Sequence, residues 1–138
     1  MRVHKSTDYA IRILHYLHNH TMCRDELPTA QMISEALRIT YPLTHNIMAK
    51  LRKKGLIASA QGRNGGYRVA KSAHNINLYD VVLAMEGELK ISYSLEADQE
   101  HTHRNQPCAL QDYYKEVGET LIQKLESKSI ADFDMIQQ

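Results

Sequence analysis

The sequence predicts a mainly α-helical fold with one small β-hairpin: a winged helix-turn-helix domain followed by a long C-terminal helix. Three observations lead to this fold class. Apolar residues recur at spacings of three and four in most segments, two of these segments are short and joined by a tight turn, and a glycine-rich turn between two strand-like segments comes directly afterwards. At 138 residues the chain can form one domain, or one domain with an appended dimerisation element.

A first amphipathic helix is expected over residues 7–19. Apolar side chains lie on one face of it at spacings of three and four, and polar side chains lie on the other. The apolar residues are Ala10, Ile13, Leu14 and Leu17. A polar segment that includes Pro28 ends this helix, so a new element is expected to begin near residue 29.

Two short helices are expected next. Thr29 is a suitable N-cap for the first, because its hydroxyl can accept a hydrogen bond from a free backbone N–H. Thr40 can cap the second, Pro42 suits its first turn, and Gly55 ends it. The apolar residues of the two helices are Ala30, Ile33 and Leu37 in the first, and Leu43, Ile47 and Leu51 in the second.

A change in the spacing of the apolar residues marks the hairpin. Residues 56–60 and 67–70 are expected to pair as strands around residues 61–66, whose sequence QGRNGG tolerates positive φ angles. The turn carries Arg63 and Asn64, so the hairpin has a polar, basic tip. It directly follows the second short helix and would lie beside it as a wing.

Helical spacing returns after Asn77 and reaches Met85, and residues 86–107 then lack a clear period. A longer helix is expected over residues 109–128, and its apolar stripe requires a partner helix. The candidate dimer-interface residues are Leu110, Tyr114, Val117, Leu121 and Leu125. Ser129 and Asp132 resemble a capping box that begins a last short helix.

Charge is divided unevenly along the chain. Residues 1–71 carry 12 Lys+Arg and 4 Asp+Glu, a balance of +8, whereas residues 72–138 carry 5 and 12, a balance of −7. The basic part can follow the phosphates of a nucleic acid, which would repel the acidic part. We therefore expect a DNA-binding domain over residues 1–75, and dimerisation helices over 76–138 with a sensor loop at about 87–107. Chance clustering of solvated charges would give the same division.

The second helix of a helix-turn-helix pair enters the major groove with its first residues facing base edges. Polar side chains near its start suit bases, and lysines suit phosphates. The candidate DNA-binding residues are Thr40, Tyr41, Thr44, His45, Asn46, Lys50, Gln61, Arg63, Asn64 and Arg68. A solvated helix face and a flexible turn contain the same residue types, but the order helix, turn, helix, hairpin favours DNA binding.

The chain resembles the Rrf family of bacterial winged-helix transcriptional regulators, which includes an iron–sulfur cluster regulator, a nitric-oxide-sensing repressor and a cysteine-metabolism repressor. The segments that carry the resemblance are KSTDYAIRIL (5–14), MAKLRKKGLI (48–57), GRNGGYRVA (62–70), INLYDVVLAMEG (76–87) and SIADF (129–133). The resemblance implies a homodimer on a palindromic DNA operator, with the long helix crossing to the partner. The leading hypothesis is a dimeric repressor or activator, with a repressor preferred, whose affinity for DNA is altered by a redox, metal or small-molecule signal at the loop before that helix.

Two details depart from the family pattern. Many members have an arginine before the first wing glycine, where this chain has Gln61. Members that hold an iron–sulfur cluster usually bind it with three loop cysteines, whereas this loop has Cys108 alone, so an ordinary three-cysteine cluster is excluded. Either no cofactor is bound, or an atypically ligated iron–sulfur cluster is. The candidate ligands are Cys108, Asp8, His101 and His103. Asp8 as a simple helix cap is the alternative for that residue.

Several classes of protein are excluded or less favoured. No hydrolase elbow, Walker loop or zinc-protease motif occurs, so no enzymatic activity is expected. The apolar run at residues 81–85 is far too short to span a membrane, and two cysteines make no disulfide framework, so a soluble cytoplasmic protein is expected. The alternative function is a winged-helix protein-interaction module without sequence-specific DNA binding.

Overall fold

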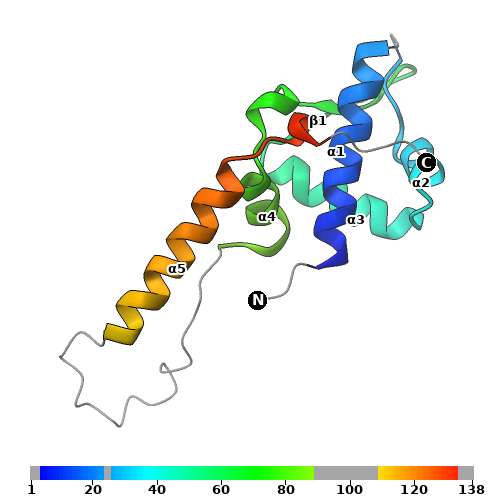
Figure 1. Cartoon of the computed structure of the whole chain (residues 1–138). Helices are drawn as coiled ribbons and strands as arrows, with labels where there is room; N and C mark the ends of the chain where they lie inside the picture. Colours follow the sequence, from blue (N-terminus) through cyan, green and yellow to red (C-terminus); the bar gives the residue numbers. More distant parts are fainter. Residues whose placement is uncertain (1–3, 24–25, 89–108, 134–138) are drawn as a thin grey trace.

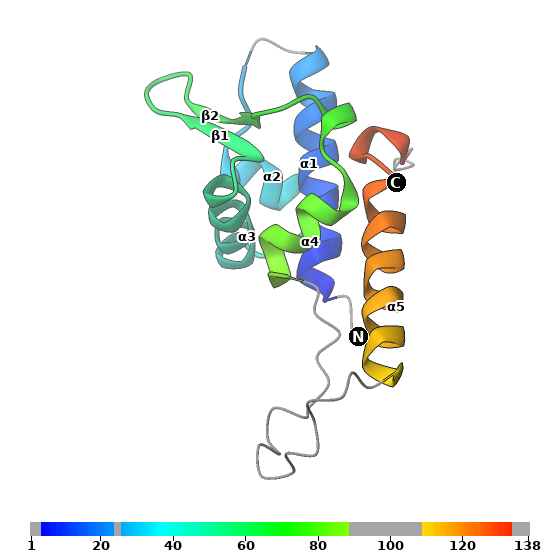
Figure 2. The same cartoon turned by 90° about the vertical axis from the view of Figure 1, so that its left-hand side faces the viewer.

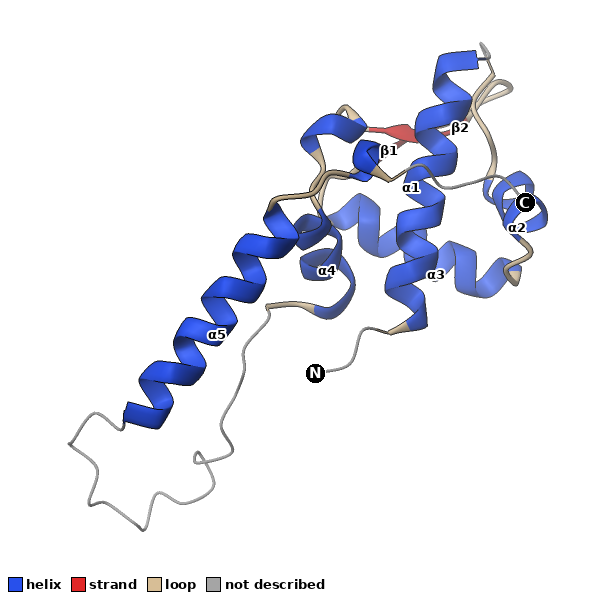
Figure 3. Cartoon of the chain, viewed as in Figure 1, coloured by secondary structure: helices blue, strands red, loops and turns tan. Residues whose placement is uncertain are grey.

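The computed structural model describes residues 4–23, 26–88 and 109–133 (Figure 1). The elements in chain order are α1 (Lys5–Cys23), α2 (Ala30–Leu37), α3 (Tyr41–Lys53), β1 (Ile57–Ala60), β2 (Gly66–Val69), the 3-10 helix η1 (Ala73–Asn75), α4 (Leu78–Glu86), α5 (Ala109–Glu126) and the 3-10 helix η3 (Ile130–Asp132). Figure 3 shows helices throughout and a single hairpin in the described ranges. The predicted fold class is confirmed.

Helix α1 lies at the centre of the core. Its four predicted apolar residues, Ala10, Ile13, Leu14 and Leu17, are all fully buried. The helix packs on α2, α3, α4 and β2. It is longer at both ends than the predicted range of residues 7–19, because polar residues do not end a helix and neither proline nor glycine interrupts the segment.

One hydrophobic core includes residues from both sides of the expected domain boundary, although α5 contributes none of its buried residues. Ile76, Val81, Met85 and Ile130 belong to the same buried cluster as the residues of α1 and α3. The expected boundary between residues 75 and 76 therefore does not separate two cores.

Backbone pairing joins the end of α5 to the start of α4. The Ile130 N–H donates to the Ile76 carbonyl at 2.8 Å, and the Leu78 N–H donates to the Lys128 carbonyl at 3.0 Å. The predicted Ser129–Asp132 cap begins η3, since the Ser129 N–H donates to Asp132 Oδ2 at 2.8 Å. These bonds position α5 against the winged-helix core.

Helix α5 extends away from the rest of the molecule at its N-terminal end (Figures 1 and 2). It packs on α4, and none of its residues is buried. Within the described ranges, no helix combines the length and hydrophobicity of a membrane span.

A histidine pair joins α1 to η1. The rings of His18 and His74 meet edge to face, with their centroids 6.2 Å apart. Burial lowers the pKa of His18 below its ordinary value of 6.5, and the nearby charges of His15 and His74 lower it further. The folded protein therefore favours the neutral form of His18.

We predict that stability falls in mild acid. The contribution of His18 is fully present above the unfolded pKa of 6.5 and is lost as the pH falls through the lowered folded pKa, because the unfolded chain binds the proton more readily. Urea unfolding followed between about pH 5 and pH 8 measures this slope. His18→Asn should flatten the slope, whereas His45→Asn, on the exposed face of α3, should keep it. An unchanged slope in His18→Asn would contradict the prediction.

Candidate nucleic-acid interface

Helix α3 has one buried face and one exposed face. The buried residues are Thr44, Ile47, Met48 and Leu51. The exposed residues are Tyr41, Pro42, His45, Asn46, Ala49, Lys50, Arg52 and Lys53. Apart from Arg52, which bonds to Ser59 of β1, the exposed positions recur at intervals of one and three, as expected for one continuous side of a helix. We call this side the outer face of α3.

The turn between α2 and α3 fixes the angle between the two helices. The Thr29 hydroxyl caps α2 as predicted, accepting from the Met32 N–H at 3.2 Å. At the other end of α2, Ile39 is buried, and the Ser34 hydroxyl donates to its carbonyl at 2.6 Å. The Ile39 N–H donates to the Ser34 carbonyl at 3.0 Å. Both helices are thus held in the helix-turn-helix arrangement.

Two threonines at the start of α3 correct the sequence prediction. Thr40 is the N-cap residue, but its side chain makes no capping hydrogen bond. Thr44 was expected to face DNA, yet it is fully buried, and both its N–H and its hydroxyl donate to the Thr40 carbonyl at 2.9 Å. Because a hydroxyl can satisfy itself on the carbonyl four residues back, this polar side chain turns inward. We therefore remove Thr44 from the candidate DNA contacts.

The hairpin is attached directly to α3. Strands β1 and β2 pair antiparallel with Ile57 opposite Val69 and Ala60 opposite Gly66. Ile57 is buried, so the base of the hairpin is fixed in the core while its tip extends outward. Arg52 Nη1 donates to the Ser59 Oγ at 3.2 Å, which joins the last turn of α3 to β1.

Gly66 allows the hairpin to lie against the segment before α2. A Cβ at this position would come within 2.6 Å of the Pro28 carbonyl oxygen and 2.7 Å of that of Leu27. The next residue, Tyr67, donates its N–H to the Pro28 carbonyl at 2.9 Å. This close approach holds the hairpin on the same side of the molecule as α3, as Figure 2 shows.

The interface segment has an unusual charge. Residues 36–79, which include α3 and the hairpin, contain no aspartate or glutamate and eight Lys+Arg. Lys50, Lys53, Arg63 and Arg68 are exposed within it. A segment of this kind attracts a polyanion and has no carboxylate of its own to repel one.

Nine of the ten predicted DNA-binding residues are exposed. They are Thr40, Tyr41, His45, Asn46 and Lys50 at or on α3, and Gln61, Arg63, Asn64 and Arg68 on the hairpin. Sequence reasoning missed Pro42 and Ala49, which belong to the outer face of α3. Pro42 follows Tyr41 and Ala49 precedes Lys50. Once the buried apolar residues of α3 were known, helical spacing would have placed both on the exposed side.

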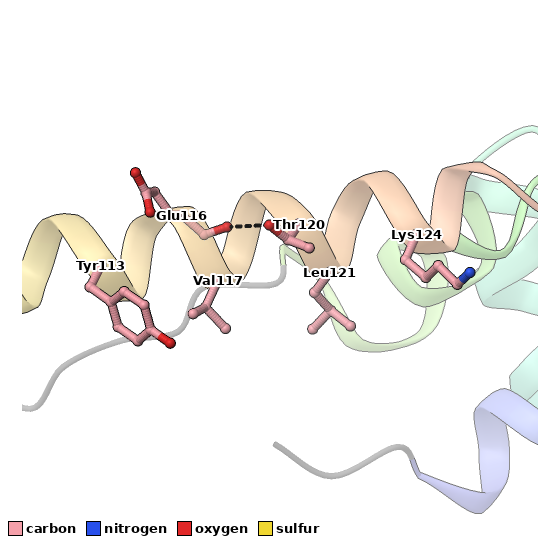
Figure 4. A pocket seen from close by; sticks show the side chains of 6 residues that line it. All are labelled: Tyr113, Glu116, Val117, Thr120, Leu121 and Lys124. Carbon is pink, nitrogen blue, oxygen red and sulfur yellow. Dashed lines mark hydrogen bonds between the residues drawn. The ribbon is translucent and has the colours of Figure 1, made fainter.

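A second candidate surface lies on α5, where an open groove of about 510 Å³ runs along the helix (Figure 4). Its lining residues are Tyr113, Glu116, Val117, Thr120, Leu121 and Lys124. Tyr113 is 60% exposed and Val117 is 38% exposed, and both point to the same side as Leu121. Two predicted interface residues, Val117 and Leu121, therefore share this side with Tyr113, which the sequence prediction omitted. Leu110, near the start of the helix, is 45% exposed. Tyr114 and Leu125 are half-buried.

The predicted cluster ligands do not form a metal site in the described part of the chain. Asp8 is exposed in the first turn of α1, and Cys108, His101 and His103 lie outside the described residues. No three His, Cys, Asp or Glu side chains come together there as a metal ion would require. One carboxylate alone does not hold iron or an iron–sulfur cluster.

Residues 3–134 match the family model described as "Rrf2: Iron-dependent Transcriptional regulator". The chain is 30% identical over 132 residues to the HTH-type transcriptional regulator NsrR of Shouchella clausii, covering 96% of this chain and 87% of that protein. It is 29% identical over 132 residues to NsrR of Halalkalibacterium halodurans, covering 96% and 89%.

Solved structures share the fold. CymR, the global cysteine regulator of B. subtilis, superposes with a TM-score of 0.74 at 17% identity, covering 96% of this chain and 95% of the other. IscR of T. potens superposes with a TM-score of 0.70 at 23% identity, covering 100% and 94%. Both likenesses concern the winged-helix fold.

We predict that substitutions at the neighbouring residues Thr44 and His45 have different effects, because Thr44 is on the buried face of α3 and His45 is on its exposed face. Thr44→Val should lower the free energy of unfolding by about 1 kcal/mol, through the lost hydroxyl bond, and leave affinity for DNA unchanged. His45→Ala should leave stability unchanged and weaken binding to a preferred DNA site by about 1–3 kcal/mol. Urea unfolding and fluorescence anisotropy on labelled duplex measure the two effects. Weaker DNA binding by stably folded Thr44→Val would show that Thr44 reaches the DNA.

Proposed function

The chain belongs to the Rrf2 family of transcriptional regulators, and we propose that it binds a palindromic double-stranded DNA operator as a homodimer in the cytoplasm. It is a DNA-binding regulator and not an enzyme. One observation supports the proposed mode of binding above all: the outer face of α3 and the hairpin tip are exposed together in a segment without a carboxylate. This favours DNA over the alternative of an acidic protein partner, because the order of elements is that of a major-groove reader with a wing.

The side chains divide by chemistry into two roles. His45 and Asn46, near the start of the outer face, have ring nitrogens and an amide that can bond to base edges in the major groove. Tyr41 packs beside His45, with ring centroids 6.1 Å apart, and offers an apolar surface next to them. Lys50 lies further along the helix, where its charge suits a phosphate. Arg63, at the hairpin tip, suits a phosphate or the adjacent minor groove.

The groove on α5 supports a second copy of this chain as the dimer partner. Apolar side chains that remain exposed along a helix are stabilised when a partner helix covers them. Acidic and basic residues, Glu116 and Lys124, also line the groove. In a two-fold arrangement, the acidic residue of one copy can face the basic residue of the other.

We also propose that a signal acts through the sensor loop at about 87–107 and that the protein is a repressor. Support for a signal comes from the family description, which names iron, and from a structural relative titled as a cysteine regulator. Repression is the direction of regulation that we prefer on the family resemblance. Residues 89–108 lie outside the described ranges, so both points remain predictions.

The first test uses a duplex enriched from random DNA by the full chain. Lys50→Ala and Arg63→Ala should each weaken binding, by about 1 kcal/mol or more, and lower the slope of log affinity against log salt by about 0.9 for each lost phosphate contact. Anisotropy titrations from low to physiological salt measure both quantities. Lys115→Ala, an exposed cation on α5, should change neither. Affinity that is insensitive to salt and to both substitutions would refute the proposal.

The second test concerns the oligomer. Val117→Asp places a charge in the groove on α5 and should shift the protein from dimer to monomer, because burying an unpaired carboxylate is unfavourable. Light scattering after size-exclusion chromatography measures the mass. Gln123→Asp introduces the same residue at an exposed position outside the groove lining and should remain dimeric. A dimer of unchanged stability in Val117→Asp would place the interface elsewhere.

A further inference from the structure

Arg38 adopts a backbone conformation that arginine disfavours. At the end of α2 it has φ 55° and ψ 43°, in the left-handed region. Four residues in the described ranges have a positive φ angle, and Arg38 is the one that is not a glycine. The other three are Gly55, Gly62 and Gly87. The Cβ of an L-residue crowds the backbone in this conformation, and glycine avoids that crowding.

The fold does not require the Arg38 side chain. Its backbone N–H donates to the carbonyls of Glu35 and Ser34, and a glycine would make the same bonds. The side chain is exposed, and no hydrogen bond or ion pair within the described residues engages the guanidinium. The turn is instead held by Ile39 and the Ser34 hydroxyl. The residue thus destabilises the turn without a compensating contact inside the chain, a pattern associated with functional positions.

The position of Arg38 suggests the missing contact. It lies three residues before Tyr41, the first residue of α3. Glu35, three residues before it, accepts from Gln31 Nε2 at 3.4 Å, and no ion pair joins it to Arg38 within the described residues. When the start of a recognition helix enters the major groove, the turn before it comes near the sugar–phosphate backbone bordering that groove. A guanidinium can donate two parallel hydrogen bonds to one phosphate.

We propose that Arg38 contacts a backbone phosphate of the bound DNA and that the chain carries arginine in a glycine-type conformation for this contact. The proposal rests on the proposed DNA-binding function and adds a residue to it. It predicts opposite changes in stability and in affinity for one substitution, which a merely structural role for Arg38 would not produce.

The test is Arg38→Gly in the full chain, with the enriched duplex as the probe. The melting temperature should rise by roughly 2–5 °C, because the strained conformation is relieved. Affinity for DNA should fall about 3- to 10-fold, and the slope of log affinity against log salt should fall by about 0.9, as expected for one lost phosphate contact. Arg38→Asn, which tolerates the left-handed region and lacks charge, should bind as weakly as Arg38→Gly. Arg38→Lys should keep the slope.

The outcomes separate this proposal from the broader one. Unchanged affinity and slope in Arg38→Gly, with losses in Lys50→Ala and Arg63→Ala, would overturn the Arg38 contact and leave the DNA-binding proposal in place. Unchanged binding in all three would overturn both. A lower melting temperature in Arg38→Gly would overturn the argument from strain, because the arginine would then contribute to the folded state.

Discussion

Burial of one face of α3 is the constraint on which the rest of the structure depends. Ile47, Met48 and Leu51 pack into the core around α1 and are at most 1% exposed. Since successive residues of a helix are about 100° apart, this burial leaves only one side of α3 facing outward. The candidate DNA-contacting side chains are therefore oriented by hydrophobic contacts in which they take no part.

The sequence was sufficient to predict every described α-helix and the hairpin, because apolar spacing records which residues the core will bury, but it did not predict the short 3-10 helix η1. It was insufficient where a side chain could be either buried or exposed. Thr44 is polar, but its hydroxyl bonds to Thr40 and is buried. Tyr113 and Tyr114 are adjacent aromatics, but Tyr113 is 60% exposed and Tyr114 is half-buried, a difference that apolar spacing along the sequence does not record. Arg38 carries no local signal at all, since its conformation runs against its own preference.

The molecule has two candidate functional sides that differ in charge. In Figure 2, α3 and the hairpin lie on one side of α1 and α4, and α5 lies on the other. The first side belongs to the segment without carboxylates, whereas α5 carries four acidic and two basic residues. This separation keeps the acidic helix away from a polyanion bound at α3, so that attraction at one side is not offset by repulsion at the other.

A single core also determines how the two sides are related. The segment after α5 pairs with the segment before α4 through Ile76 and Ile130, and both residues are buried with Val81 and α1. Helix α5 is therefore attached to the body that orients α3 through packed and hydrogen-bonded contacts. In the proposed dimer, the separation of the two copies of α3, and with it the spacing of the operator half-sites, is set by packing against that core. A change in the angle of α5 would act first on α4 and on the paired segments at Ile76 and Ile130, which belong to the core that orients α3.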